Sequence, residues 1–354
     1  MKCILITRWL NFSRFKDVFF LPLFVCISSA TKAQNDSTSP PYPAPGKLVD
    51  VGGWKLHINA TGRKHDSLPT VILESGAGDF SVEWSLVQPE VAKFTRVCSY
   101  DRAGDGWSEW GPHPRTFHQI VYELHTLLMN AGEKPPFVFV AHSYGGWLVR
   151  LYAITYPQEV VGMVLVETGG DDPLRMMPDG KLKHVSELVK GDTIPAVKTS
   201  GPLKLSDIPP AALDQIRSGL HDASVHANDP PRNKLPLRAR QMRTWALGQI
   251  GHIVAAVNPY DIEELAQLRT AMMKRNNPFG DMPIIVLTRG LPEELGANAK
   301  YVEDVHRKDQ EQLASLSSKG KLIVAEKSAH HIQIEQPELV IQSIHEVVVA
   351  ARKK

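Results

Sequence analysis

Short apolar runs alternate with helical stretches along most of this chain, and this alternation constrains the fold more than any other feature. Runs of this kind that resemble buried strands are residues 71–73, 96–100, 137–140, 161–166, 284–287 and 322–325. Strands that are apolar along their whole length are typical of a parallel sheet covered on both faces by the intervening helices. Polar and apolar residues alternate along residues 47–51 and 55–59, and Gly52-Gly53 lies between the two runs. This pattern predicts a hairpin at an antiparallel edge of the sheet. We therefore expect an α/β fold with a mostly parallel, eight-stranded sheet.

The run at residues 137–140 leads into a serine flanked by small residues. Residues 137–146 read Phe-Val-Phe-Val-Ala-His-Ser-Tyr-Gly-Gly, and a helix-compatible stretch, residues 147–156, follows at once. A strand that turns sharply into a helix strains the residue at the turn, so its neighbours must be small. The usual pattern is G-x-S-x-G, and Ala141 takes the place of the first glycine here. This serine turn, residues 141–145, makes Ser143 the candidate nucleophile.

A serine hydroxyl needs a base, and the base expected here is a histidine that a carboxylate holds in one tautomer. In a strand–turn–helix context the chain order is nucleophile, acid, histidine. The last predicted strand is followed closely by His330 and His331. A loop at that point would return either histidine to the edge of the sheet where Ser143 lies.

The acid is less well defined by the sequence. Glu167 directly follows one predicted strand, and Glu293 follows the next in Gly290-Leu291-Pro292-Glu293. Both positions lie at the carboxyl edge of a parallel sheet, within reach of a histidine there. We prefer Glu167 and keep Glu293 as the first alternative. Glu303 or Asp304, in a helical stretch, is the second.

Acyl transfer also needs hydrogen-bond donors for the oxyanion that develops on the substrate. The main-chain N–H of Tyr144, which directly follows the nucleophile, is one candidate. The other is the N–H of Ala77, because Ser75-Gly76-Ala77-Gly78 is flexible enough to turn a main-chain N–H inward.

Residues 171–280 interrupt the alternation of strands and helices. They are helical in pattern, contain Pro209-Pro210 and Pro230-Pro231, and show no clear strand; residues 240–256 form their best helix. An insertion between two sheet strands should lie over the carboxyl ends of the strands, where ligands bind. We interpret it as a helical lid on a core of residues 47–170 and 281–354; the alternative is a passive structural elaboration.

The N-terminus resembles an export signal, residues 1–33. A basic region that includes Arg8 and Arg14 precedes an apolar core, residues 18–27, and Thr31-Lys32-Ala33 fits a loose cleavage site. A core of about ten residues is short for a membrane span. The alternative is an uncleaved membrane anchor, because Pro22 interrupts the core.

Residues 34–46 are polar and proline-rich, so we expect a flexible leader. The protein is then exported to the periplasm or secreted, with no stable membrane span once the signal is removed. The whole chain has a formal net charge of +2, and residues 1–33 alone carry +4, so the remaining residues carry −2. This charge balance gives no indication of nucleic-acid binding.

Cysteine and histidine usage indicates neither disulfides nor a metal. Of the three cysteines, only Cys98 would remain after signal cleavage, and it lies in an apolar strand as an inert core residue. The scattered histidines match no ligand spacing. We expect no metal site and no cofactor.

From about residue 47 to the end, the chain resembles the α/β-hydrolase superfamily, in its serine-nucleophile, lid-containing branch. The resemblance rests on residues 74–78, Asp-Arg-Ala-Gly-Asp-Gly-Trp-Ser at 101–108, the serine turn, and Ser328-Ala329-His330. It implies that Asp101 and Arg102 are a buried structural pair. It also selects His330 as the base, which leaves His331 as a solvent-facing loop histidine.

Two departures from the family pattern stand out. Glu293 takes the place of the aspartate that usually follows the seventh strand, although in some members the acid follows the sixth strand, where Glu167 lies. The His-Gly motif of the oxyanion loop is Ser75-Gly76 here.

The resemblance implies a serine hydrolase that cleaves an ester, or less readily an amide, of a small to medium apolar substrate through an acyl-enzyme. In this interpretation the triad is Ser143, His330 and Glu167, and the partner is a small-molecule ester. The alternatives are a peptidase or lyase on the same scaffold, and a non-catalytic binding protein that keeps the fold.

Overall fold

The structure is a computed structural model that describes residues 4–6, 23–25, 41–189, 200–208, 210–274, 277–293 and 297–352. The predicted signal peptide lies outside these residues, apart from two short strands, β1 (Ile4–Ile6) and β2 (Leu23–Val25), which pair antiparallel. The predicted leader is described only from residue 41. Within the described part of the chain, no helix has both the length and the hydropathy that crossing a membrane requires.

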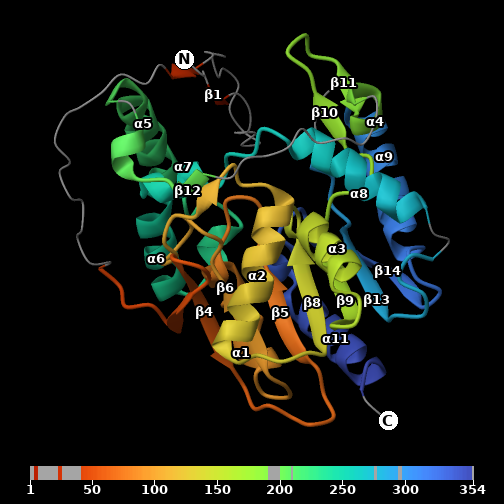
Figure 1. Cartoon of the computed structure of the whole chain (residues 1–354). Coiled ribbons are helices and arrows are strands. Elements are labelled where there is room, and N and C mark those ends of the chain that lie inside the picture. The colour runs from red at the N-terminus through yellow and green to blue at the C-terminus, as the bar shows by residue number, and fades with distance from the viewer. Residues whose placement is uncertain are drawn as a thin grey trace.

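A twisted eight-stranded sheet forms the centre of the molecule, with strand order β14-β13-β9-β8-β5-β6-β4-β3 (Figure 1). Its strands are β3 (Lys47–Asp50), β4 (Lys55–Thr61), β5 (Thr70–Glu74), β6 (Val97–Tyr100), β8 (Phe137–His142), β9 (Val160–Val166), β13 (Ile284–Arg289) and β14 (Gly320–Ala325). From β14 to β6 all neighbours are parallel, whereas β4 pairs antiparallel with both β6 and β3. The predicted sheet and its antiparallel hairpin are confirmed.

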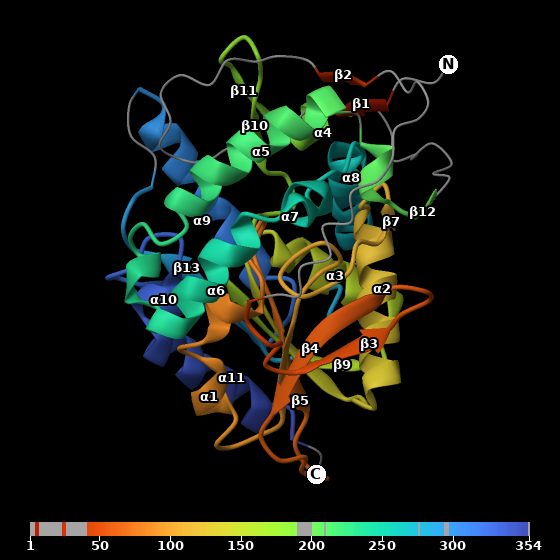
Figure 2. The ribbon, with the colours of Figure 1, turned by 90° about the vertical axis from the view of Figure 1, so that its left-hand side faces the viewer.

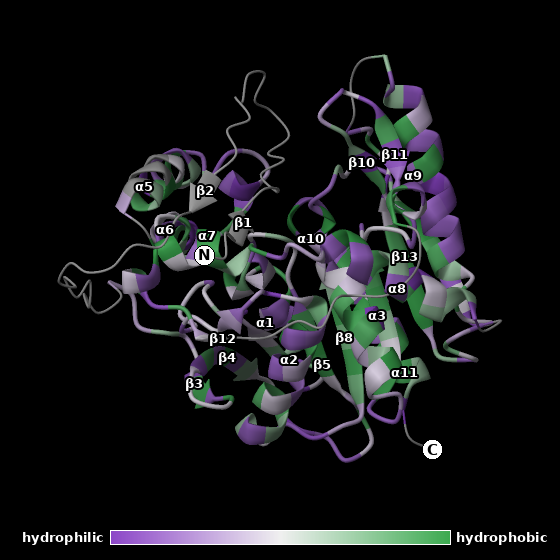
Figure 3. Cartoon of the chain, turned by 45° about the horizontal axis from the view of Figure 1, so that its top comes forward, coloured by the Kyte–Doolittle hydropathy of each residue, from purple (hydrophilic) through white to green (hydrophobic). Residues whose placement is uncertain are grey.

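Helices cover both faces of the sheet. The helices are α1 (Gln88–Val91), α2 (Phe117–Ala131), α3 (Gly145–Thr155), α9 (Ala299–Ala314) and α11 (Pro337–Ala350). Successive side chains of a strand point to opposite faces, so in β8 Phe139 packs on the side of α2 and α3, and Val140 packs on the side of α1 and α11. Figure 3 shows the strands as predominantly hydrophobic between these layers. Burial raises the pKa of the Cys98 thiol to about 12, in keeping with an inert core residue.

The described residues of the insertion, which spans residues 171–280, lie at the top of the sheet in Figures 1 and 2. Its helices are α4 (Val185–Leu188), α5 (Pro210–Val225), α6 (Leu237–Leu247), α7 (Ile250–Ala255) and α8 (Asp261–Met273). Two sequence expectations are wrong here. The segment contains strands, because β10 (Leu174–Met176) pairs with β11 (Leu182–His184), and β12 (Ser200–Pro202) pairs with β7 (Pro112–His113). The single helix expected at residues 240–256 is two helices, since α6 ends at Leu247 with Gly248 as its C-cap and α7 begins at Ile250.

Candidate active site

The serine turn has the strained geometry that its sequence predicts. Ser143 lies between β8 and α3 with φ of 51°, a left-handed conformation that is uncommon outside glycine. Its glycine neighbours leave no room for a side chain. A Cβ at Gly145 would lie 2.7 Å from Cγ of Glu74, and one at Gly146 would lie 2.4 Å from Cβ of Thr168. Close packing on both sides therefore fixes the turn that projects the serine side chain.

The structure brings Ser143 and His330 together from segments 187 residues apart. His330 lies between β14 and α10 (Ile332–Glu335), and its Nε2 is 3.0 Å from Oγ of Ser143. With Nε2 as the acceptor, the ring proton resides on Nδ1. That atom is buried and has no hydrogen-bond partner among the described residues. It lies 3.7 Å from Oε2 of Glu293.

Glu167, the acid preferred from the sequence, is bound elsewhere. Its carboxylate accepts hydrogen bonds from the main chain of Arg289 at 2.7 Å and from the Arg289 guanidinium, and it lies 3.1 Å from Nε2 of His306. Burial alone would raise the pKa of Glu167, but His306, Arg289 and the nearby His330 outweigh it and lower the pKa to about 2. No hydrogen bond or ion pair joins Glu167 to His330 in the described part of the chain, so the geometry favours Glu293.

A network around Arg289 supports the loop that carries Glu293. Glu303 accepts a hydrogen bond from the main-chain N–H of Glu293 at 3.2 Å and another from the Arg289 guanidinium at 2.9 Å. Arg289 also holds Glu167. Glu303, weighed above as an alternative acid, therefore positions Glu293. Arg289 could not be predicted from the sequence, because it carries no motif signal beyond its place at the end of β13.

The Glu293 loop is also bonded to the loop that carries His330. The main-chain N–H groups of Gly290 and Leu291 both donate to the carbonyl of Ser328, at 3.2 and 3.0 Å. The candidate acid and the candidate base thus share one hydrogen-bonded support at the carboxyl edge of the sheet.

The candidate oxyanion donors, Ala77 and Tyr144, lie in the loops that follow the neighbouring strands β5 and β8. Neither main-chain N–H has a hydrogen-bond partner within the described ranges. Arg102 braces the oxyanion loop, residues 75–79, by donating to the carbonyls of Ser75 at 2.8 Å and Asp79 at 3.1 Å. The loop is therefore held by buried hydrogen bonds, while the N–H of Ala77 remains available as a donor.

Asp101 and Arg102 are buried, as the family resemblance implies, but they do not pair with each other. Asp101 binds Nδ1 of His57 at 2.8 Å and the main-chain N–H of Ser81 at 2.9 Å. Arg102 instead pairs with Glu74 at 2.7 Å. The two side chains therefore bind different partners: Asp101 binds His57 and Ser81, and Arg102 binds Glu74.

Replacing Arg102 with methionine should lower the free energy of unfolding by about 3–5 kcal/mol, because it leaves the buried Glu74 without its cation. Chemical denaturation measures the change. Lys93→Met is the matched control: Lys93 forms an exposed pair with Glu90, and its loss should cost less than about 1 kcal/mol. Equal losses in the two variants would contradict the bracing role of Arg102.

His142, immediately before the candidate nucleophile, was not predicted as a site residue from the sequence. It is buried, and its Nε2–H donates to the carbonyl of His330 at 2.9 Å, so it supports the loop of the candidate base. Burial, together with the nearby His330, lowers its pKa to about 3. The expectation of a solvent-facing His331 is wrong in part, because Nδ1 of that ring is buried against the same cluster.

The insertion is attached to the core beside the oxyanion loop. Arg243 of α6 pairs with Asp79 at 2.9 Å and with Glu83, and Arg232 of η3 (Arg232–Lys234) pairs with Asp79 at 3.3 Å. In α7, Nδ1 of His252 lies 3.0 Å from Oδ1 of Asp105. These buried contacts place insertion residues next to the candidate site.

Comparison with known proteins places this arrangement in context. Residues 71–343 match the family model described as "Alpha/beta hydrolase family". A relative from Gibberella zeae, named as an AB hydrolase superfamily protein, is 25% identical over 309 residues, which cover 84% of this chain and 91% of the relative. The residues matched by the family model include Ser143 and His330, the two residues that the structure joins.

Solved structures share the fold at low sequence identity. An esterase from Thermogutta terrifontis is 18% identical, with a TM-score of 0.55, over 87% of this chain and 99% of its own. An enol-lactonase from Burkholderia xenovorans is 14% identical, with a TM-score of 0.55, over 86% of this chain and all of its own.

Proposed function

The chain belongs to the alpha/beta hydrolase family and is an enzyme of that family, and we propose that it hydrolyses a carboxylic ester through an acyl-enzyme on Ser143. The observation that carries this proposal is the 3.0 Å contact between Oγ of Ser143 and Nε2 of His330. A nucleophile and base within hydrogen-bond reach are the minimum requirement for covalent catalysis by serine.

In the proposed reaction, Nε2 of His330 takes the proton from Ser143 as Oγ attacks the ester carbonyl. The carbonyl oxygen becomes an oxyanion, and the N–H groups of Ala77 and Tyr144 donate to it. His330 then gives its proton to the leaving alcohol as the ester bond breaks. Water, deprotonated by the same nitrogen, attacks the acyl-enzyme and releases the acid, which restores Ser143.

We propose Glu293 as the acid that holds His330 in the correct tautomer. Its Oε2 is 3.7 Å from Nδ1, and Glu293 is exposed in its loop, so a small rotation of the side chain would complete the hydrogen bond. Catalytic hydrogen bonds are often long in the absence of substrate. Glu167, by contrast, would have to break its buried contacts with Arg289 to reach the ring.

The proposal is tested with a fluorophosphonate probe and a series of p-nitrophenyl esters of increasing acyl length. We expect the probe to label one site, which peptide mass spectrometry should locate at Ser143, and we expect hydrolysis of at least the shorter esters. Labelling at a residue other than Ser143 would contradict the proposal. So would a complete lack of ester hydrolysis by the unlabelled, folded protein.

We further propose that the insertion is a lid and that residues 1–33 direct export. Buried pairs between the insertion and residues 79–83 support the first, and the basic and apolar pattern of the N-terminus supports the second. N-terminal sequencing of the protein recovered from a cell envelope fraction and from the medium tests export. A chain that retains Met1 in the cytoplasm would contradict it.

A further inference from the structure

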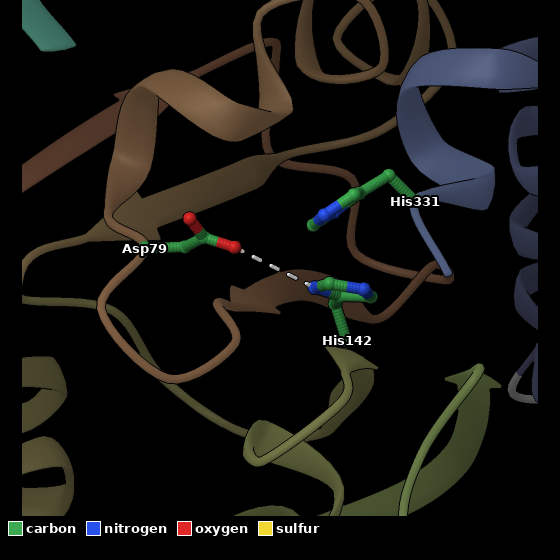
Figure 4. A group of neighbouring side chains, drawn as sticks. All are labelled: Asp79, His142 and His331. Carbon is green, nitrogen blue, oxygen red and sulfur yellow. Dashed lines mark ion pairs between the residues drawn. The ribbon is translucent and has the colours of Figure 1, made fainter. Parts of the chain in front are cut away.

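Three side chains that play no part in the proposed reaction converge behind the serine turn. Asp79 comes from the oxyanion loop, His142 from the end of β8, and His331 from the loop after β14 (Figure 4). One ligand-type atom of each lies within 4.8 Å of the other two. Figure 4 shows both imidazole rings and the carboxylate directed toward a common space.

The atoms that face this space lack partners. Nδ1 of His142 and Nδ1 of His331 are both buried and have no hydrogen-bond partner among the residues that the structure describes. The His142 side chain is almost completely buried, and its proton is on Nε2, which donates to the His330 carbonyl. Its Nδ1 therefore presents a lone pair to Oδ2 of Asp79, 3.8 Å away. Two buried acceptors that face each other require a donor or a cation between them.

The surroundings resemble the outer layer of a metal site. Histidine ligands usually donate their second ring N–H to a carbonyl or carboxylate, as His142 does to His330. Ligating carboxylates are themselves hydrogen-bonded, and Oδ1 of Asp79 accepts from Arg243 at 2.9 Å and from Arg232 at 3.3 Å. Nδ1 of His142 and Oδ2 of Asp79 are therefore left to bind an ion.

We propose that Asp79, His142 and His331 bind one divalent transition-metal ion, with Zn²⁺ as the reference metal. Two imidazole nitrogens and a carboxylate oxygen suit Zn²⁺, with water in the fourth position. Tetrahedral zinc bonds near 2.1 Å require ligand atoms roughly 3.4 Å apart. The site as it stands is slightly wider, so the side chains close on the ion. This departs from the expectation, made from spacing alone, that the chain has no metal site.

Local charge sets the expected strength of binding. Asp79 and Glu83 offset the charges of Arg232 and Arg243, so the ligands bring no excess negative charge. We therefore expect weaker binding than in sites with several thiolate ligands. The ion would join the oxyanion loop, the serine turn and the His330 loop, so its effect is to stabilise the site against unfolding.

The test uses the full chain, free of any histidine tag, stripped with a chelator and then titrated with Zn²⁺. We expect one zinc per chain by elemental analysis and a higher Tm with zinc. Co²⁺ in place of zinc should give the visible absorption of a four-coordinate site. His331→Gln should weaken binding by at least about tenfold. His65→Ala, which removes an exposed histidine before β5, is the matched control and should bind normally.

Wild-type protein that binds no zinc and shows no Tm shift would overturn the proposal, and an ordered water molecule would then satisfy the three side chains. Equal zinc binding by wild type and folded His331→Gln would also overturn it, because the ion would lie elsewhere. Neither readout depends on ester hydrolysis, so failure here is separate from failure of the proposed function. Circular dichroism verifies that the variant is folded.

Discussion

Replacing Ser143 with alanine is expected to lower kcat for ester hydrolysis by roughly 10⁶-fold, the scale seen when a triad nucleophile is removed. The proposed acyl-enzyme cannot form without Oγ, and His330 then has no hydroxyl to deprotonate. The alanine should leave the fold intact, since Ser143 is only half-buried and the close contacts of the turn are made by its glycines. Steady-state kinetics on a p-nitrophenyl ester and fluorophosphonate labelling both measure the loss.

His330→Ala is the companion variant. Residues that act as a unit are strongly non-additive, so His330→Ala and the double variant with Ser143→Ala should each lose about as much as Ser143→Ala alone. Thermal melting serves as the control for folding. If the losses in kcat of the two single variants multiplied in the double variant, Ser143 and His330 would not act as a unit. Probe labelling of the Ser143→Ala protein would also contradict that unit.

Replacing Glu293 with glutamine should lower kcat by about 10³- to 10⁴-fold, because an amide no longer stabilises the imidazolium and can favour the wrong tautomer of His330. The same change at Glu167 should leave kcat within about tenfold of the parent, since its carboxylate is held by Arg289 and no hydrogen bond or ion pair joins it to His330 among the described residues. The pair is a matched comparison: both residues are glutamates that follow parallel strands, and both substitutions preserve shape.

Glu167→Gln should instead affect stability. The pKa of Glu167 is about 2, against an ordinary value of 4.5, so its ionised form stabilises the native state above pH 4.5. That contribution, on the order of 3 kcal/mol, is lost as the pH falls from about 4.5 toward 2. The glutamine variant should be less stable than the parent at pH 7, with a difference that shrinks in acid.

Denaturant midpoints at pH 7 and pH 3, measured beside kcat, separate the two roles. If Glu167→Gln lost activity as severely as Ser143→Ala while Glu293→Gln did not, then Glu167 would be the acid and the observed geometry would have to rearrange. Small, equal losses in both variants would mean that neither glutamate orients His330.

The sheet and the serine–histidine contact are predictable because their determinants are local. Apolar runs such as residues 137–140 identify buried strands wherever they occur. A serine between a strand and a helix, with Gly145 after it, specifies a strained turn without any knowledge of the rest of the fold. His330 follows from chain order and from the edge at which parallel strands end.

The acid could not be chosen in the same way, because its identity depends on distant partners. Glu167 and Glu293 occupy equivalent places after strands, and Arg289 and His306, which engage Glu167, carry no motif. The inward turn of His331 likewise depends on Asp79 and His142, which come from other loops. The pairing of β12 with β7 joins the insertion to a distant part of the core, which spacing does not reveal.

The shared support of Glu293 and His330 has a mechanical consequence. Because Gly290 and Leu291 donate to the carbonyl of Ser328, the two candidate catalytic side chains are carried by one joined piece of backbone. Thermal motion of that piece would shift both together, changing the gap to Ser143 more than the gap between them. Heating should therefore weaken proton abstraction from the serine before it disturbs the tautomer of the imidazole.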